Sequence, residues 1–208
     1  MRDKTHLIFD MDGTLIDSSQ LLANTINYVR QKLGLSKLAE DTIIRALNDT
    51  TINPAHFYYE AEQFEPHHER YFQEYYLANH AKESRLYEGM ADFLREASRT
   101  RRLSVATNAY DVSTRPLLEN LGIADYFDIV MSADLVPKPK PHPHMLEHII
   151  DHYGEPKERF VMIGDGERDM LAAQQAGIDS LLVEWGFSSH TDALHSVEAL
   201  GERLGVHL

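Results

Sequence analysis

The sequence HLIFDMDGTLIDS, residues 6–18, carries two acids, Asp10 and Asp12, at the end of an apolar run. The run Leu7–Phe9 is typical of a buried β-strand, and side chains two positions apart on an extended chain share one face. Both carboxylates can therefore reach one point while Met11 turns away. Two like charges this close require a cation or a shared proton. These residues alone leave a simpler interpretation open, in which Asp12 and Gly13 form a turn and Asp10 is a solvated strand end.

The rest of the chain predicts a parallel sheet that contains this strand. Four more β-rich runs follow, at residues 103–107, 127–131, 160–163 and 180–183. Helical patterns separate these four, and each is followed directly by the glycine expected just beyond a helix: Thr114–Leu121, Met145–Tyr153 and Arg168–Ala176. Strands that alternate with helices form a parallel sheet with helices on both faces. We therefore expect an α/β fold with a Rossmann-like, doubly wound parallel sheet, closed by a helix over 192–204.

The segment between the first two strands is far longer than one crossover needs, and its pattern is helical. The predicted helices span about 18–34, 39–47, 55–64 and 66–81. We expect residues 16–88 to form an inserted α-helical cap domain. The core domain would then consist of residues 1–15 and 89–208, and RLYEGM (85–90) would be the return linker.

Composition narrows the classes of function. The chain of 208 residues is 43% hydrophobic, enough for a proper core, and its formal net charge is −13. Nucleic acids and anionic membranes bind basic surfaces, so neither is expected as the main partner. The chain has no cysteine, which excludes disulfides and thiolate metal sites. No segment approaches the ~20 apolar residues of a membrane span, and we expect a cytoplasmic protein.

A second acidic group follows the predicted strand at 160–163. The segment VMIGDGERDM places Asp165 and Asp169 where a helix begins, a position at which acids also serve as caps. Four acids at two strand ends nevertheless offer the hard oxygen ligands that suit Mg²⁺, which keeps some waters and accepts a substrate phosphate. An EF-hand is excluded because Leu15 and Met170 stand where its loop requires glycine. A dinucleotide site is excluded because Asp169 occupies the third glycine position.

Groups suited to an anionic substrate follow two other strands. Thr107 ends the strand at 103–107, and its hydroxyl and the backbone amides around Asn108 make an anion cradle before a helix. After the next strand, VPKPKPHPHML presents Lys138 and Lys140 on a chain that its prolines hold extended. One of these lysines would supply the positive charge that an anion needs beside so many acids. The other is expected to be a solvated surface charge.

These motifs, in this order, resemble the four motifs of the haloacid dehalogenase superfamily. The matching segments are DMDGT, the strand that ends in Thr107, the lysine before PHP, and GDGERD. The likeness is strongest to phosphoglycolate phosphatase-like hydrolases with a helical first-site cap. The resemblance implies a nucleophile at Asp10, an acid/base at Asp12, a phosphate-binding hydroxyl at Thr107, the lysine at Lys140, Mg²⁺ ligands at Asp10, Asp12 (backbone carbonyl) and Asp165, and a supporting acid at Asp169.

The expected chemistry is that of a Mg²⁺-dependent phosphatase that hydrolyses a small phosphomonoester through an aspartyl-phosphate. An aspartate with an ordinary pKa of ~3.9 is ionised at neutral pH and needs no base to attack phosphorus. Asp12 would protonate the alkoxide leaving group and then activate water. A halide leaves without a proton, so the second acid disfavours dehalogenation. Two alternatives stay open: an isomerase of the same fold similar to beta-phosphoglucomutase, that is, a phosphomutase, and a catalytically silent phosphate-binding protein.

The helical pattern of the cap is interrupted within residues 45–56, and we expect the cap to contact the leaving group through this segment. The candidate substrate-binding residues, two of them in the core, are Arg45, Asn48, Thr50, His56, Gly13 and Asn108. This break lacks the glycine-containing pattern that phosphoglycolate phosphatases usually have there. The sequence therefore predicts a small phosphorylated metabolite as ligand and does not indicate which one, nor the oligomeric state.

Overall fold

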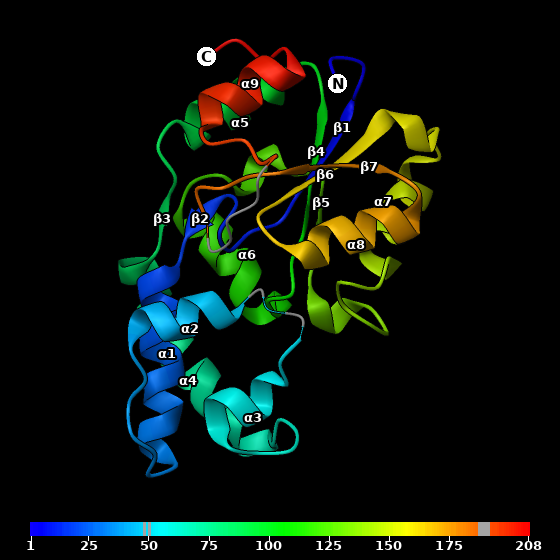
Figure 1. The fold of residues 1–208 in the computed structure, drawn as a ribbon. Helices are drawn as coiled ribbons and strands as arrows, with labels where there is room; N and C mark the ends of the chain where they lie inside the picture. The colour runs from blue at the N-terminus through cyan, green and yellow to red at the C-terminus, as the bar shows by residue number, and fades with distance from the viewer. Residues whose placement is uncertain (48, 50, 187–191) are drawn as a thin grey trace.

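A five-stranded parallel sheet, in the order β5–β4–β1–β6–β7, forms the centre of the protein (Figure 1). The computed structural model describes residues 1–47, 49, 51–186 and 192–208. The strands are His6–Phe9 (β1), Arg102–Ala106 (β4), Ile129–Met131 (β5), Phe160–Gly164 (β6) and Asp179–Leu182 (β7). In the central strand, Leu7 lies opposite Leu103 of β4 and Val161 of β6. All five predicted runs form strands of this sheet, which confirms the predicted fold class.

Helices cover both faces of the sheet because its strands are apolar on both sides. On one face, Leu7 and Phe9 of β1 pack among side chains of α5, α6 and α9. On the other face, Ile8 of β1 and Met162 of β6 pack against α7 and α8. These helices are Met90–Ala97 (α5), Asp111–Asn120 (α6), His144–Tyr153 (α7), Glu167–Ala176 (α8) and Val197–Leu204 (α9), and short 3₁₀ helices span Ala124–Tyr126, Ala133–Leu135 and Lys157–Arg159.

Two of these helices differ from the sequence-based expectation. Helix α5 was not predicted, although Met90 and Phe93 are fully buried on its inner face. Helix α9 begins at Val197 rather than at 192, because the Ser196 hydroxyl caps it by accepting a hydrogen bond from a backbone N–H of its first turn. Leu194, part of the predicted helix, forms a β-bridge with Val183 instead.

The inserted segment forms a helical cap below the carboxyl ends of the strands (Figure 1). Its helices are Ser19–Lys32 (α1), Glu40–Leu47 (α2), Pro54–Tyr59 (α3) and Pro66–Glu83 (α4). They surround a small core of their own that includes Ile26, Val29, Ile43 and Tyr58. Helix α3 was expected to reach residue 64. It stops at Tyr59 because Glu60 adopts a left-handed conformation, with φ of 57°.

A two-stranded antiparallel ribbon joins the cap to the core. Ile16–Asp17 (β2) pairs with Arg85–Leu86 (β3), so part of the predicted return linker is a strand. Across the ribbon, Nη2 of Arg85 lies 2.8 Å from Oδ2 of Asp17. The ribbon lies close to both predicted ends of the cap, and the domain boundaries at 16 and 88 stay a prediction.

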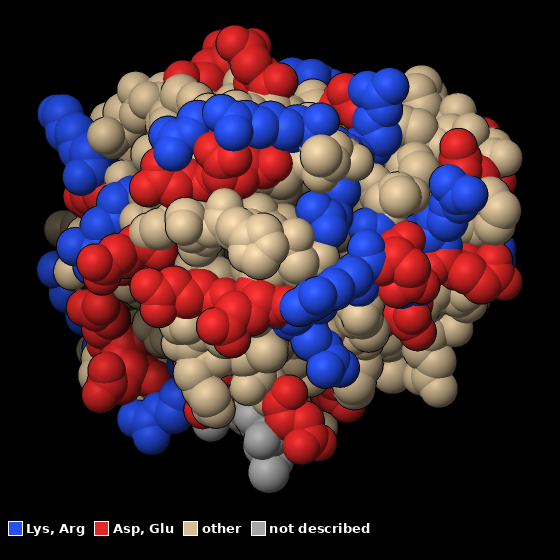
Figure 2. All heavy atoms as spheres, turned by 90° about the horizontal axis from the view of Figure 1, so that it is seen from above, with Lys and Arg blue, Asp and Glu red and all other residues tan. Residues whose placement is uncertain are grey.

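The end of the molecule opposite the cap carries charges of both signs. Figure 2 views it from above and shows Lys and Arg interspersed with Asp and Glu. On α5, Arg95 pairs with Asp92 at 2.7 Å, and Arg99, just beyond the end of the helix, pairs with Glu96 at 2.6 Å. The expectation that nucleic acid is not a partner stays a prediction. Within the described ranges, no helix combines the length and the apolar character that crossing a membrane requires.

Candidate active site

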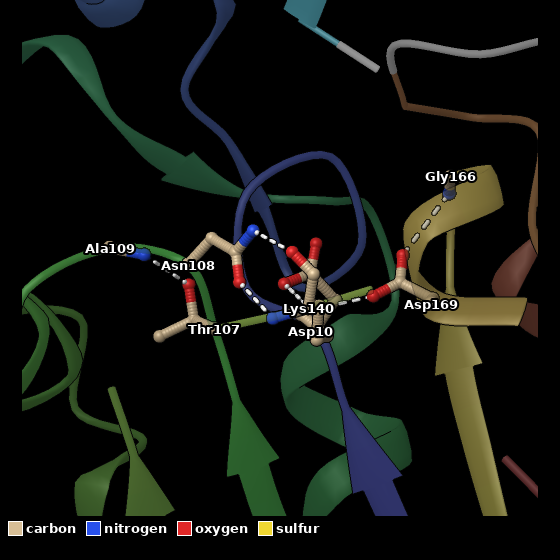
Figure 3. A network of polar contacts seen from close by, with 7 residues as sticks. All are labelled: Asp10, Thr107, Asn108, Ala109, Lys140, Gly166 and Asp169. Carbon is tan, nitrogen blue, oxygen red and sulfur yellow. Dashed lines mark hydrogen bonds and ion pairs between the residues drawn. The ribbon is translucent and has the colours of Figure 1, made fainter. Parts of the chain in front are cut away.

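The carboxyl ends of three neighbouring strands bring predicted site residues together. Asp10 follows β1, Thr107 follows β4 and Asp165 follows β6. Parallel strands end at the same edge of a sheet, and the loops beyond them form the ligand crevice. The three residues are 9%, 1% and 1% exposed, respectively. This edge of the sheet is therefore a buried polar site, of which Figure 3 draws the network around Asp10.

Lys140 connects the acids of this site. Its Nζ donates to Oδ1 of Asp10 at 2.7 Å and to Oδ1 of Asp169 at 2.5 Å (Figure 3). Burial disfavours the charged amine, but the two carboxylates outweigh burial and raise the pKa of Lys140 above its ordinary value. Lys140 is therefore a buried ammonium, whereas Lys138 is exposed at the surface. Of the two candidate lysines, the structure brings Lys140 into the site.

Asn108 and Thr107 organise the loop after β4. The Asn108 amide donates to the backbone carbonyl of Lys140 at 2.9 Å and accepts from its backbone N–H at 3.0 Å. Asn108 therefore fixes the loop from which Lys140 extends, and its predicted substrate contact stays a prediction. The Thr107 hydroxyl oxygen accepts from the backbone N–H of Ala109 at 3.1 Å. Its own proton remains available for an anion.

The acids fit a divalent cation. One carboxylate oxygen from each of Asp10, Asp165 and Asp169 lies within 4.8 Å of the others. Burial raises the pKa of Asp10 well above its ordinary value, Lys140 opposes this effect, and the charges of Asp169 and Asp165 add to it. An ionised Asp10 therefore needs more positive charge than Lys140 supplies. A cluster of hard oxygen donors with excess negative charge is the donor set that Mg²⁺ prefers.

Gly13 allows the loop after β1 to approach this cluster. Its φ is +85°, and a Cβ at this position would lie 2.6 Å from Oδ2 of Asp165. A side chain here would both strain the backbone and displace the carboxylate. The structure thus shows close packing against the acids at Gly13, and the predicted substrate contact of this residue stays a prediction.

Asp12 has a different environment from Asp10. Its Oδ1 accepts a hydrogen bond from the hydroxyl of Ser18 at 2.5 Å, and burial raises its pKa. A raised pKa favours the protonated carboxyl that a proton donor needs. Ser18 was expected only near a helix start, where serine usually caps. Its fully buried side chain makes no cap bond and turns to Asp12 instead, a role that the sequence does not signal.

A cavity of about 360 Å³ lies between the cap and the strand ends. Its core side includes Asp10, Asp12, Thr107 and Lys140. Its cap side is largely apolar and includes Leu22, Ile26, Phe64, Phe72, Tyr76 and Leu77. The volume falls within the range of small-molecule sites, roughly 300–1,000 Å³. The spacing of Phe72 and Tyr76 puts them on one face of α4, and this face lines the cavity.

Two of the predicted cap contacts, Arg45 and His56, lie away from the cavity. Arg45 is exposed and its Nε donates to the Asp41 carbonyl at 3.0 Å, because α2 turns Ile43 and Ala46 inward. The side chain of His56 is also exposed, on the first turn of α3. Neither residue lines the cavity, so the structure does not bring these two candidates to the site. Asn48 and Thr50 lie outside the described residues.

Comparisons with known proteins agree with this geometry. A family model described as haloacid dehalogenase-like hydrolase matches residues 7–183. The phosphoglycolate phosphatase of Nitrosococcus oceani is 33% identical over 201 residues, which cover 89% of this chain and 86% of that protein. The phosphoglycolate phosphatase of Caulobacter vibrioides is 31% identical over 209 residues, with 97% and 86% covered. A haloacid dehalogenase-like hydrolase structure from Streptococcus pneumoniae superimposes with a TM-score of 0.83 at 25% identity, covering 98% of this chain and all of that one.

The chain therefore belongs to the haloacid dehalogenase-like hydrolase family, which confirms the resemblance drawn from its motifs. The two phosphoglycolate phosphatases are about one third identical to this chain over most of both lengths. The protein is therefore a phosphatase of that family.

Proposed function

We propose that this phosphatase is Mg²⁺-dependent and hydrolyses a small phosphomonoester through an aspartyl-phosphate on Asp10. The observation that carries the proposal is the position of the Asp10 carboxylate, 2.7 Å from the buried ammonium of Lys140, in the wall of a cavity of ligand size. A carboxylate that attacks a phosphate dianion needs positive charge beside it, and Lys140 supplies part of that charge.

The reaction divides into two steps. Asp10 attacks phosphorus, the bond from phosphorus to the alcohol oxygen breaks, and Asp12 gives its proton to the departing alkoxide. A water then attacks the phosphorus of the aspartyl-phosphate and Asp12 takes its proton. Inorganic phosphate leaves, and the Asp10 carboxylate is regenerated. Thr107 and Lys140 would hold the phosphoryl oxygens throughout.

Asp10, Asp165 and the backbone carbonyl of Asp12 are the groups proposed to hold Mg²⁺. The fit rests on the clustered oxygens of Asp10, Asp165 and Asp169. When bound, the ion would neutralise charge between the phosphate and its attacker. Asp169 is bonded to Lys140 and to the backbone N–H of Gly166, at 3.2 Å, so its proposed role is to hold the lysine in place.

A panel of phosphate esters, assayed for free phosphate with and without Mg²⁺, tests the proposal. A hydrolase releases phosphate in step with the alcohol. Isomerisation of a sugar phosphate with little phosphate release would instead identify a phosphomutase. Ligand binding without turnover of any ester would identify a silent phosphate-binding protein.

Removal of the metal provides the first prediction. We expect exhaustive treatment with EDTA to abolish turnover and added Mg²⁺ to restore it, whereas Ca²⁺, with its looser geometry, should substitute poorly. Asp165→Asn should weaken Mg²⁺ activation, and Asp125→Asn, at an exposed acid of the first 3₁₀ helix, should not. The measurement is phosphate release against Mg²⁺ concentration. Full activity after complete chelation contradicts the metal site.

The hydrogen bond from Ser18 to Asp12 provides the second prediction. We expect Ser18→Ala to lower kcat for an alkyl phosphate by roughly tenfold, because the proton donor loses the group that orients it. For a nitrophenyl ester, whose leaving group needs little protonation, the rate of the first step should fall less. Ser19→Ala is the matched control, since the neighbouring hydroxyl bonds Asp17 at 2.7 Å. Equal kcat values for Ser18→Ala and the unmodified protein would rule out this role.

A further inference from the structure

We propose that the preferred substrate is the phosphate ester of an uncharged, largely apolar alcohol of about the size of a benzyl group, rather than of a small hydroxy acid. This inference rests on the proposed phosphatase function and concerns the part of the cavity that receives the leaving group. It is carried by the apolar surface, the charge and the hydrogen-bonding groups on the cap side of the cavity.

The cap presents apolar surface to the leaving group from the depth of the cavity to its mouth. Leu22 and Ile26 of α1 and Phe72 of α4 line the interior. At the mouth, Phe64 and Leu77 of the cap and Tyr110 of the core line the cavity and remain 47%, 37% and 37% exposed. Exposed large apolar side chains grouped at a cavity entrance are typical of a binding site for apolar ligands. Burial of a hydroxy acid's carboxylate against this apolar surface would cost desolvation energy.

The charges of the cap wall disfavour an anionic leaving group. Among the described residues of the cap that line the cavity, the one charged side chain is Glu69, which would repel a carboxylate. His68 is buried there, and burial lowers the pKa of its imidazole, so it adds no positive charge at neutral pH.

Two cations, Lys140 and Arg168, line the core side of the cavity among the described residues. Lys140 is bonded to Asp10 and Asp169. Arg168, at the start of α8, also lines the cavity, and its charge contributes to the lowered pKa of Asp49 in the cap only after the hydrogen bonds from Thr51. Arg168 is therefore the cation that a second anionic group on the substrate would have to reach.

The cap wall also includes neutral hydrogen-bond donors, among them Tyr76 and His68. The Tyr76 hydroxyl is buried and has no hydrogen-bond partner among the described residues. The Nδ1 atom of His68 accepts from the backbone N–H of Glu65 at 3.2 Å, which puts the ring proton on Nε2. Neutral donors suit the ester oxygen or one uncharged acceptor of a ligand, and a buried donor without a partner favours a ligand that supplies one.

Three esters that share the same O–CH₂ group test this inference: benzyl phosphate, ethyl phosphate and phosphoglycolate. They differ only in whether a phenyl ring, a methyl group or a carboxylate is attached, so the chemistry at phosphorus is closely matched. We expect kcat/KM, measured by phosphate release with Mg²⁺, to be higher for benzyl phosphate than for phosphoglycolate by about tenfold or more, with ethyl phosphate between them.

A single added charge tests the cap wall directly. Gln73 lines the cavity from α4, and Ala78 on the same helix is exposed and lies outside it. We expect Gln73→Lys to shift the ratio of kcat/KM toward phosphoglycolate by about tenfold, while Ala78→Lys leaves the ratio within about twofold. Arg168→Met should alter the benzyl and glycolate esters alike.

The outcomes separate this inference from the function on which it rests. If no ester is hydrolysed, p-nitrophenyl phosphate included, the phosphatase proposal fails and the substrate class fails with it. If p-nitrophenyl phosphate is hydrolysed but phosphoglycolate equals or exceeds benzyl phosphate, only the substrate class is overturned. A selective loss of phosphoglycolate turnover in Arg168→Met would also overturn it, because Arg168 would then bind the carboxylate.

Discussion

Asp10→Asn should lower phosphate release by roughly 10⁴-fold or more, because it removes the attacking oxygen charge and a metal ligand together. The fold should survive, since the amide is nearly isosteric and Lys140 keeps Asp169 as a partner at 2.5 Å. The substitution also removes one of three clustered acids. Thermal unfolding without metal should therefore show a melting temperature equal to or above that of the unmodified protein.

The companion variant Asp12→Asn should fail at a different step. An alkyl phosphate, whose alkoxide must be protonated, should be slowed in the first step. A nitrophenyl ester should still phosphorylate Asp10, and its turnover should stop at hydrolysis of the aspartyl-phosphate. Rapid mixing should then show a burst of nitrophenol roughly stoichiometric with enzyme, followed by slow release. Substantial activity in Asp10→Asn, or no burst together with equal losses on both esters in Asp12→Asn, would refute the assignment of the two acids.

Lys140→Met should have the second largest effect, on activity and on stability together. It removes the charge proposed to face the phosphate and leaves Asp10 and Asp169 buried without their ammonium partner. Breaking a buried ion pair in this way costs about 3–5 kcal/mol in the free energy of unfolding. Lys138→Met is the matched control, because that side chain is exposed two residues away on the same loop. We expect it to change neither property appreciably.

The stability loss in Lys140→Met should depend on pH. Burial already raises the pKa of Asp10, and removal of the lysine takes away the charge that opposes this shift. A carboxyl whose pKa is raised in the folded state favours folding while it is protonated, and that contribution is lost as pH rises through the folded-state pKa. Denaturant unfolding in EDTA should therefore show the deficit relative to the unmodified protein growing from acidic to neutral pH. Similar losses for Lys138→Met and Lys140→Met would mean that the wrong lysine has been assigned.

The sequence predicts those parts of the site that are fixed by local pattern. Asp10, Thr107 and Asp165 follow apolar strand runs, and the parallel topology alone brings strand ends to one edge. The order of the motifs, with the lysine before PHP, favours Lys140 over Lys138. Their different burial follows from the hydrogen bonds between Asn108 and the Lys140 backbone, which join residues far apart in the sequence.

Features that depend on packing between distant segments could not be read from the sequence. The helical spacing of Phe72 and Tyr76 predicts one apolar face, and the same spacing serves a cap core or a cavity wall. Ser18 has the residue type of a helix cap, and its bond to Asp12 forms only because the chain turns back after β1. The end of α3 depends on a left-handed glutamate, Glu60, a conformation more typical of glycine or asparagine.

The β2–β3 ribbon has a consequence for the timing of the reaction cycle. The chain leaves the core and returns to it through two short strands that are paired with each other, Ile16–Asp17 and Arg85–Leu86. Because both connections lie side by side in this ribbon, a rotation of the cap relative to the sheet would have its hinge there. Entry of the substrate and departure of the alcohol and of phosphate would then all require the same rotation of the cap. If the chemical steps are fast, this rotation would be the rate-limiting step of turnover. Substitutions in the ribbon would then change kcat without altering a reacting group.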